Sequence, residues 1–161
     1  MMPRGFTAVE LLLVAVLILI VTGMALPWIP GVIQAYRLRV AAWDLAGDLR
    51  LARQKAVSTQ VRHRVCFAEC GNPKGNTPVP NPGYVVERED GADNWRLDFT
   101  VDFSRQLLGT AINIDPPTEN TVVFNARGTS GPGTVTLANP SGKYKVVTAQ
   151  TGRVRVCRGS C

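Results

Sequence analysis

The segment Gly152-Arg153-Val154-Arg155, close to the end of the chain, has the spacing best suited to binding an anion. If the segment is a strand, Arg153 and Arg155 project from the same face, because side chains alternate along a strand. The two side chains then lie roughly 6 to 7 Å apart, close to the phosphate spacing along one DNA strand. Arginine presents a planar fork that makes bidentate contacts with phosphate. Gly152 permits a tight turn that exposes backbone N–H groups to an anion.

The last third of the chain carries charge of one sign. No Asp or Glu follows Glu119, and the net charge of the whole chain is +6. A field of one sign attracts polyanions such as nucleic acid, anionic lipid or an acidic protein face. The alternative is a basic surface for solubility, or an edge strand whose arginines prevent aggregation or pair with a neighbouring subunit. Besides Arg153 and Arg155, four basic residues are candidates for the same site: Lys143, Lys145, Arg158 and Arg127.

No constellation of residues indicates catalysis, a metal ion or a cofactor. His63 is the only histidine, and it is expected to pack in a strand because no second histidine or nearby carboxylate accompanies it. The glycine-rich segment 128–133 lacks the Lys-Ser/Thr pair and following helix of a phosphate-binding loop. Asp98 and Asp102 are interpreted as exposed acids of a strand or turn. We therefore expect a protein that is not an enzyme.

Four cysteines occur as two Cys-x3-Cys pairs, Cys66 with Cys70 and Cys157 with Cys161. Such pairs could hold a metal ion. Disulfides are favoured if the chain is exported to an oxidising compartment. Local pairing is favoured for its small loops, whereas crossed pairing would join the last strand to the first and stabilise more because the closed loops are longer. The spacing leaves the connectivity open.

The elements that must position these residues are a long helix and an antiparallel sheet. An apolar face recurs at helical spacing in the second half of a helix predicted over 7–59, with interruptions at Pro27 and Pro30 and resumption near Gln34. The members of that face are Leu38, Ala42, Leu45, Leu49, Ala52 and Ala56. Period-two patterns then predict strands at 61–67, 84–89, 95–99, 121–125, 134–138, 143–148 and 153–157. Residues 101–114 are interpreted as an irregular strand, and the fold class is α+β.

The beginning of the chain predicts a membrane segment. No charged residue occurs from Leu11 to Tyr36, a stretch long enough to cross a bilayer as a helix. Glu10 stands at its head, where an acidic side chain is costly unless it is paired. We infer that its partner is the α-amine of Phe6 in a neighbouring subunit, created if the chain is cut after Gly5.

The heptapeptide Gly5-Phe6-Thr7-Ala8-Val9-Glu10-Leu11 resembles the class III signal of type IV pilins and type II secretion pseudopilins. The resemblance implies cleavage after Gly5 by a prepilin peptidase, N-methylation of Phe6 and assembly with other pilin subunits. It divides the chain into a leader (1–5), a membrane and filament-core half of the helix (6–34) and a periplasmic globular domain (35–161). The resemblance also implies a single-pass anchor in inner-membrane lipid with the body in the periplasm. The subunit would later be part of a pilus filament at the cell surface.

Two further segments are similar to the GspH/FimT branch of the pilin superfamily. One is the helix end Asp48–Val57, and the other is Gly152-Arg153-Val154-Arg155, which matches the Gly-Arg-x-Arg motif of FimT-type minor pilins. The second match implies non-specific binding of the DNA phosphate backbone for uptake in natural transformation. The alternative is a structural minor pilin, or an H-type pseudopilin of type II secretion, without DNA binding. A membrane-anchored periplasmic domain unrelated to filaments is a third possibility.

Overall fold

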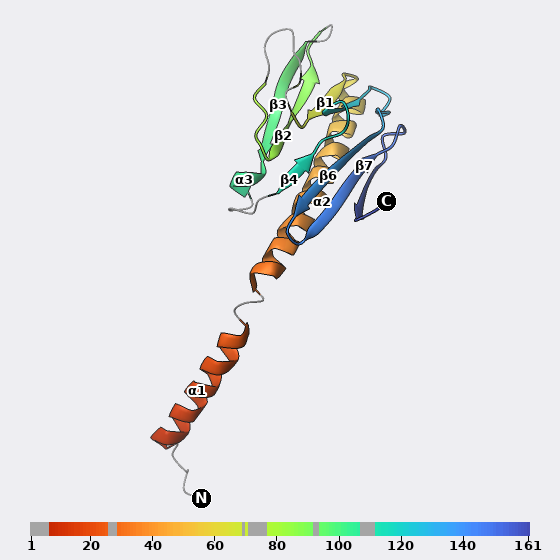
Figure 1. The fold of residues 1–161 in the computed structure, drawn as a ribbon. Coiled ribbons are helices and arrows are strands. Elements are labelled where there is room, and N and C mark those ends of the chain that lie inside the picture. The colour runs from red at the N-terminus through yellow and green to blue at the C-terminus, as the bar shows by residue number, and fades with distance from the viewer. Residues whose placement is uncertain (1–6, 26–28, 69, 71–76, 92–93, 107–111) are drawn as a thin grey trace, which may run out of the picture. The chain divides into compact units, whose positions relative to one another are not determined.

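The computed structural model describes the chain apart from residues 1–6, 26–28, 69, 71–76, 92–93 and 107–111. Two compact units are present, Met1–Ile33 and Gln34–Cys161. Gly5 and Phe6, the predicted cleavage and methylation positions, lie outside the described residues. The elements are drawn in Figure 1.

Helix α1 spans Ala8–Ala25 and begins with a capping motif. The backbone N–H of Glu10 donates to the Thr7 hydroxyl oxygen (3.3 Å) and to the Thr7 carbonyl (3.1 Å). Thr7 is therefore the N-cap, and Glu10 is the acidic third residue of a Thr-x-x-Glu capping sequence. A carboxylate in the first turn also stabilises the helix, because it interacts favourably with the positive end of the helix dipole. Glu10 thus has a role within its own helix in addition to the predicted intersubunit one.

The predicted membrane span includes residues 26–28, which the structure does not describe. Within the described ranges, no helix combines the length and the apolar character that crossing a bilayer requires.

Helix α2 spans Ile29–Thr59, so the helix resumes earlier than predicted. Pro30 does not interrupt it, contrary to the sequence prediction. Pro30 is the second residue of α2, and a proline in the first turn is tolerated because its missing N–H would have no helical partner there. Pro27 lies outside the described residues. The predicted apolar face is confirmed, since its six members are buried: Leu38, Ala42, Leu45, Leu49, Ala52 and Ala56.

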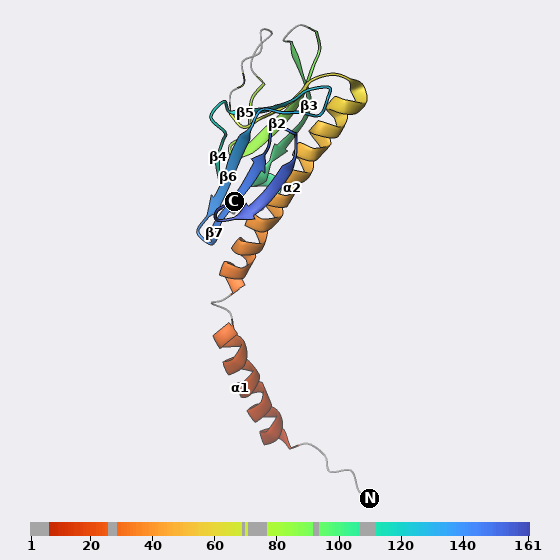
Figure 2. The same ribbon diagram turned by 90° about the vertical axis from the view of Figure 1, so that its right-hand side faces the viewer.

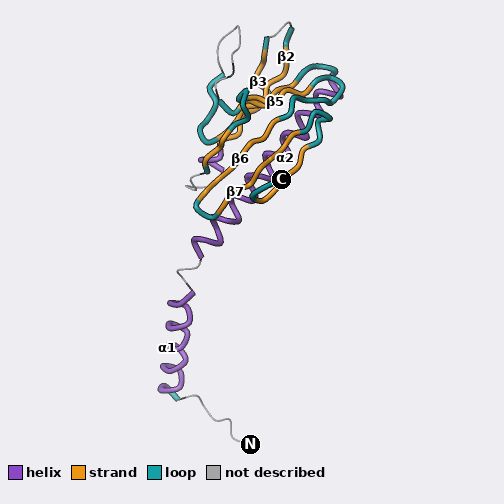
Figure 3. Tube along the Cα trace, turned by 45° about the vertical axis from the view of Figure 1, so that its right-hand side comes forward, coloured by secondary structure: helices purple, strands orange, loops and turns teal. Residues whose placement is uncertain are grey.

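The predicted α+β fold, a helix packed on antiparallel strands, is confirmed, and the described strands are divided between two four-stranded antiparallel sheets. Sheet A has the order β3-β2-β1-β5, and sheet B has the order β4-β6-β7-β8. The strands of sheet A are β1 (His63–Cys66), β2 (Gly83–Glu89), β3 (Trp95–Asp102) and β5 (Thr121–Phe124). Those of sheet B are β4 (Asn113–Asp115), β6 (Gly133–Asn139), β7 (Gly142–Thr148) and β8 (Val154–Arg158). Figure 2 and Figure 3 show β6 and β7 running beside α2.

The segment 101–114 is not one irregular strand. Its first residues end β3, and a short helix α3 (Phe103–Gln106) follows. Asp102 stops the strand because its carboxylate accepts hydrogen bonds from the N–H (2.9 Å) and the hydroxyl of Ser104. Such a side-chain acceptor at a helix start competes with strand pairing. Asn113–Asp115 then forms β4 at the edge of sheet B.

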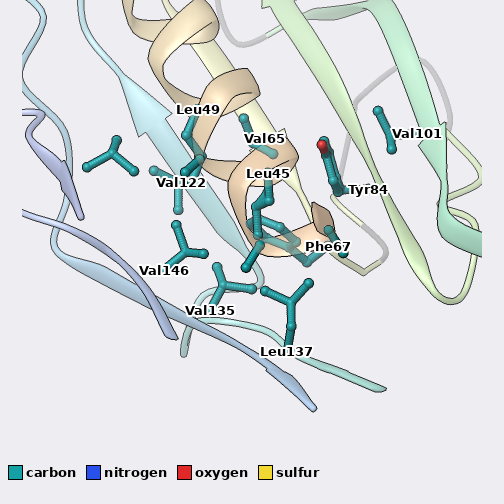
Figure 4. Close-up of a cluster of buried hydrophobic side chains, with 14 of the residues drawn as sticks. Leu45, Leu49, Val65, Phe67, Tyr84, Val101, Val122, Val135, Leu137 and Val146 are labelled. Atoms are coloured by element: carbon teal, nitrogen blue, oxygen red, sulfur yellow. The ribbon is translucent and has the colours of Figure 1, made fainter. Parts of the chain in front are cut away.

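The buried core lies between α2 and both sheets, and it contains side chains from all three. In Figure 4, Leu45 and Leu49 of α2 point toward Val65 and Val122 of sheet A and Val146 of sheet B. Complete burial of a leucine side chain contributes about 1.5 to 3 kcal/mol. The α2 face therefore fixes where both sheets lie, and with them the strands that carry the basic residues.

Tyr84 of β2 attaches sheet A to the helix by a polar contact. It is fully buried, and its hydroxyl donates to the Asp48 carboxylate of α2 at 2.6 Å. Burial, followed by this hydrogen bond and the negative charges of Asp48 and Asp44, raises the pKa of the Tyr84 hydroxyl. Tyr84 consequently acts as a donor that holds the helix and β2 together.

Candidate nucleic-acid interface

Strand β8 is an outer strand of sheet B. It contains Arg155, and Arg153, the other arginine of the predicted anion site, immediately precedes it. Among the described strands it pairs only with β7, where Arg155 faces Val147 and Val154 faces Thr148. Val154 is buried and Val156 packs against the core, while Arg153 and Arg155 are exposed. The predicted alternation is therefore confirmed, with the strand beginning at Val154, one residue later than expected. Arg153 and Arg155 project from the outer surface.

Lys143 and Lys145 of β7 share that surface. Lys145 faces Cys157 across the sheet and Val147 faces Arg155, and residues opposite each other in a ladder project from the same face. We call the side chains of Lys143, Lys145, Arg153 and Arg155 the basic face. None of the four makes an ion pair or side-chain hydrogen bond with any residue that the structure describes. Their charges are available to an external anion.

Arg158 does not belong to the basic face. It faces Tyr144 across the ladder, so it projects from the other side of sheet B than Arg155. The expectation that Arg158 joins Arg153 and Arg155 fails because strand alternation separates residues an odd number apart. Arg158 is nevertheless exposed at the strand end.

Gly152 has a packing role that its sequence position did not reveal. The residue is buried with φ +74°, and its N–H donates to the Ala149 carbonyl at 2.8 Å within the β7–β8 turn. The N–H is therefore bonded within the protein and is not available to an anion, contrary to the sequence prediction. A Cβ here would lie 1.9 Å from the carbonyl oxygen of Gly128.

Arg127 approaches the site through this contact. It lies in the β5–β6 connection, is exposed, and precedes Gly128, whose carbonyl touches Gly152. The same connection is held to the β7–β8 turn by Ser130, whose N–H donates to the Gln150 carbonyl (3.1 Å) and whose hydroxyl donates to the Ala149 carbonyl (3.0 Å). Arg127 is 26 positions before Arg153 in the sequence. The structure nevertheless places the turn that follows Arg127 against the turn that precedes Arg153.

Both cysteine pairs form local disulfides, with Cα–Cα distances of 6.0 Å for Cys66–Cys70 and 5.4 Å for Cys157–Cys161. Among the described residues, no group of three His, Cys, Asp or Glu side chains could hold a metal ion. His63 is buried, with its Nδ1 3.0 Å from the Val61 carbonyl oxygen, which confirms its predicted role as a packed strand residue.

Sequence reasoning missed a second copy of the Arg-x-Arg pattern. Strand β1 and the residue before it contain Arg62 and Arg64, followed by Val and a Cys-x3-Cys pair, as β8 does. Here the arginines are paired. Arg64 donates to Glu87 at 2.6 Å, with side chains 8% and 1% exposed, and Arg62 donates to Glu89 at 2.8 Å. The alternating position of Glu87 and Glu89 in β2 was the signal that could have indicated this.

The family model for the type II transport protein GspH matches residues 41–152. The chain belongs to the GspH family. The match ends at Gly152, immediately before Arg153 and β8, so the family assignment rests on the part of α2 from Ala41 onward and on strands β1 to β7. A sequence comparison with curated proteins gives no match.

Solved structures with the same fold include a minor pilin and a minor pseudopilin. The type IV minor pilin FimU of Pseudomonas aeruginosa is 17% identical, with TM-scores of 0.52 and 0.56 in two crystal forms. These matches cover 73% and 76% of this chain and 90% and 89% of FimU. The minor pseudopilin EpsH of the Vibrio cholerae type 2 secretion system is 12% identical with a TM-score of 0.57, covering 77% of this chain and 99% of EpsH. This GspH-family protein is thus a type IV pilin-like minor pilin or pseudopilin with an α+β fold.

Proposed function

We propose that this GspH-family protein is a minor pilin of a type IV pilus that binds DNA without sequence specificity, through the basic face. The observation that carries the proposal is a set of four cations on one side of sheet B, three exposed and Lys145 half-buried, without a carboxylate partner among the described residues. Binding would serve DNA uptake in natural transformation. No sequence preference is expected, because phosphate contacts position a duplex without reading its bases.

The geometry of the basic face supports phosphate as its ligand. Arg153 and Arg155 are two residues apart at the start of β8. Lys145 lies on the neighbouring strand, across from Cys157. Adjacent strands are about 4.8 Å apart, and alternate residues of a strand about 6.7 Å apart. A grid of positive charges with these spacings fits the repeating negative charge of a nucleic-acid backbone. Arg127, on the adjoining turn, would extend the grid beyond β8.

The predicted processing and anchoring complete the proposal. Cleavage after Gly5, methylation of Phe6 and pairing of the new amine with Glu10 of a neighbouring subunit would incorporate the protein into a filament through α1. Membership of a family of membrane-anchored, periplasmic pilins and pseudopilins supports this route and an association with other pilin subunits. Prepilin peptidase and inner-membrane lipid are then transient partners.

The test is DNA binding by the full chain, kept soluble in a non-ionic detergent so that no detergent charge competes with phosphate. Fluorescence anisotropy of a labelled duplex is measured across a series of salt concentrations for the wild type and for R153Q/R155Q. Removing two phosphate contacts is expected to lower the slope of log K against log salt by about 2. The affinity at low salt should fall by at least about tenfold.

The matched control is R88Q/R96Q. Arg88 and Arg96 are also exposed, and they face each other across β2 and β3 of sheet A. Their replacement changes the net charge equally but leaves the basic face intact, so DNA affinity should change less than about twofold. Equal losses in both double variants would show that only overall charge matters, and that outcome contradicts the proposed site.

The second candidate function is that of a structural minor pilin or H-type pseudopilin of type II secretion. It is favoured by the match to the type II transport protein GspH, which does not include β8. Under that function the basic face would contact an acidic face of another subunit. A wild-type chain that gives no salt-sensitive DNA binding would favour this second function over the first.

A further inference from the structure

Two arginines of α2 reach the segments that carry the candidate DNA contacts. The Nε of Arg53 donates to the Gly128 carbonyl at 2.9 Å, and an Nη of Arg50 donates to the Val154 carbonyl at 3.4 Å. Because they are three residues apart on a helix, both side chains lie on the same side of α2. Their acceptors are the residue after Arg127 and the residue between Arg153 and Arg155.

A junction of two glycines lies beneath Arg53. Gly128 and Gly152 have φ values of +76° and +74°. A Cβ at Gly152 would lie 1.9 Å from the Gly128 carbonyl oxygen and 2.8 Å from the Arg53 Nε. A Cβ at Gly128 would lie 2.9 Å from a methyl carbon of Val57 in α2. The two turns can therefore touch each other and the helix only because both residues lack side chains.

The Gly128 turn is also stable in itself. Its N–H donates to the Asn125 carbonyl at 2.8 Å, and the Asn125 N–H donates to the Thr129 carbonyl at 2.9 Å. These bonds shape the turn, and Ser130 holds it to the β7–β8 turn, whereas Arg53 joins the Gly128 carbonyl to the helix. Loss of Arg53 is therefore expected to let the turn shift without unfolding it.

We propose that Arg53 is a positioning residue for DNA binding, which orients Arg127 beside Arg153 by holding the Gly128 carbonyl through its Nε–H group. This inference rests on the proposed function. Arg127 and Arg153 directly adjoin the two glycines in contact, so the position of the Gly128 turn decides whether both side chains reach one phosphate backbone. Arg53 acts through Arg127 and does not itself bind phosphate.

The test uses two substitutions that remove the same charge. In R53Q the side-chain amide nitrogen lies at the same distance along the side chain as the arginine Nε and can still donate to Gly128. In R53M the corresponding atom is a methyl carbon. DNA affinity and its salt slope are measured for the full chain in non-ionic detergent, with near-ultraviolet circular dichroism to confirm folding. We expect R53Q to bind within about twofold of the wild type, and R53M to lose about fivefold.

A double-mutant cycle with Arg127 separates positioning from other roles. R127Q alone should lower affinity by about fivefold and reduce the salt slope by about 1. In the R53M background the same change should have almost no effect, because residues that act as one unit are not additive. Lys143 lies on β7 away from the junction, so K143Q should reduce affinity equally in both backgrounds.

Two outcomes overturn the inference. If R53Q loses as much affinity as R53M and the salt slope falls by about 1, Arg53 is a direct phosphate contact. If R127Q and R53M are additive, Arg53 does not act through Arg127. Should R53M fail to fold, R53Q decides by itself between retained and lost binding. A wild type that does not bind DNA refutes the proposed function instead, whereas failure confined to the Arg53 variants refutes only the positioning role.

Discussion

Strands β1 and β8 carry the same short sequence pattern and use it in different ways. Each combines Arg-x-Arg with a following valine and a Cys-x3-Cys pair closed by a local disulfide. On β1, Arg64 is buried beside Glu87 and its guanidinium carbon lies 4.3 Å from the Trp95 ring centroid. At β8, Arg155 and the preceding Arg153 are exposed.

The difference comes from the neighbouring strands. β1 is an inner strand, and β2 presents Glu87 directly across from Arg64. β8 is an outer strand of the described sheet, and its neighbour β7 presents Val147 across from Arg155. An arginine inside a sheet needs a carboxylate because an unpaired buried charge is very unfavourable. An arginine on an outer strand remains hydrated and can bind an external anion.

The largest expected effect tests the buried pair on β1. Substitution of Glu87 by Gln leaves the Arg64 charge buried without a counterion, and breaking a buried pair in this way costs about 3 to 5 kcal/mol. Urea unfolding of E87Q should show that loss in the free energy of unfolding. The control R155Q changes an exposed side chain and should stay within about 0.5 kcal/mol of the wild type. Similar losses in both variants would contradict the distinction between the two strands.

The two disulfides provide the next comparison. They close loops of equal length, so the loop-entropy contribution is the same for both, about 2 kcal/mol. Cys66 and Cys70 are also buried against Val85, whereas Cys157 and Cys161 are not part of the buried core. We expect C157A/C161A to lose about 2 kcal/mol, and C66A/C70A to lose about 1 to 2 kcal/mol more. Thermal unfolding measures both, and equal losses would mean that burial of the first pair contributes nothing.

A smaller effect is expected when a substitution converts the β8 arrangement into that of β1. Val147 faces Arg155 as Glu87 faces Arg64, so V147E supplies the missing carboxylate. The new ion pair and the added negative charge should reduce DNA affinity by about tenfold and the salt slope by about 1. V147Q has the same shape without the charge and should bind DNA within about twofold of the wild type. If V147E binds as tightly as V147Q, Arg155 is not a phosphate contact.

The smallest expected effect on stability concerns Asp44, whose carboxylate lies near the acid Asp48 instead of an arginine. Partial burial, and then repulsion by Asp48, raise the pKa of Asp44 in the folded protein. A raised folded-state pKa means that the ionised carboxylate destabilises the fold, so stability increases as pH falls through that pKa. D44N should therefore stabilise the protein at neutral pH, by less than about 0.5 kcal/mol because the side chain is exposed. Tm measured against pH should show the advantage disappear in acid, and an advantage that persists would contradict this account.

Much of the fold follows from local patterns. The apolar face of α2 has helical spacing, and the strands from Thr121 onward have period-two alternation, so both were predictable without tertiary information. The division into two sheets was not, because β4 and β5 are short and their pairing depends on contacts distant in sequence. The cysteine spacing also left more than one disulfide pairing open, because the pairing depends on which segments the fold brings together.

The candidate site shows the same limit. The sequence by itself determined that Arg153 and Arg155 share a face and that no acid follows Glu119, since strand alternation and composition are local properties. Only the tertiary structure decided which Arg-x-Arg pair stays exposed, because that depends on the strand that each one pairs with. It also decided that Arg158 faces the other way and that the turn after Arg127 packs against the turn before Arg153. The physical reason is that charge neutralisation and backbone contact act across space, between segments that the sequence keeps far apart.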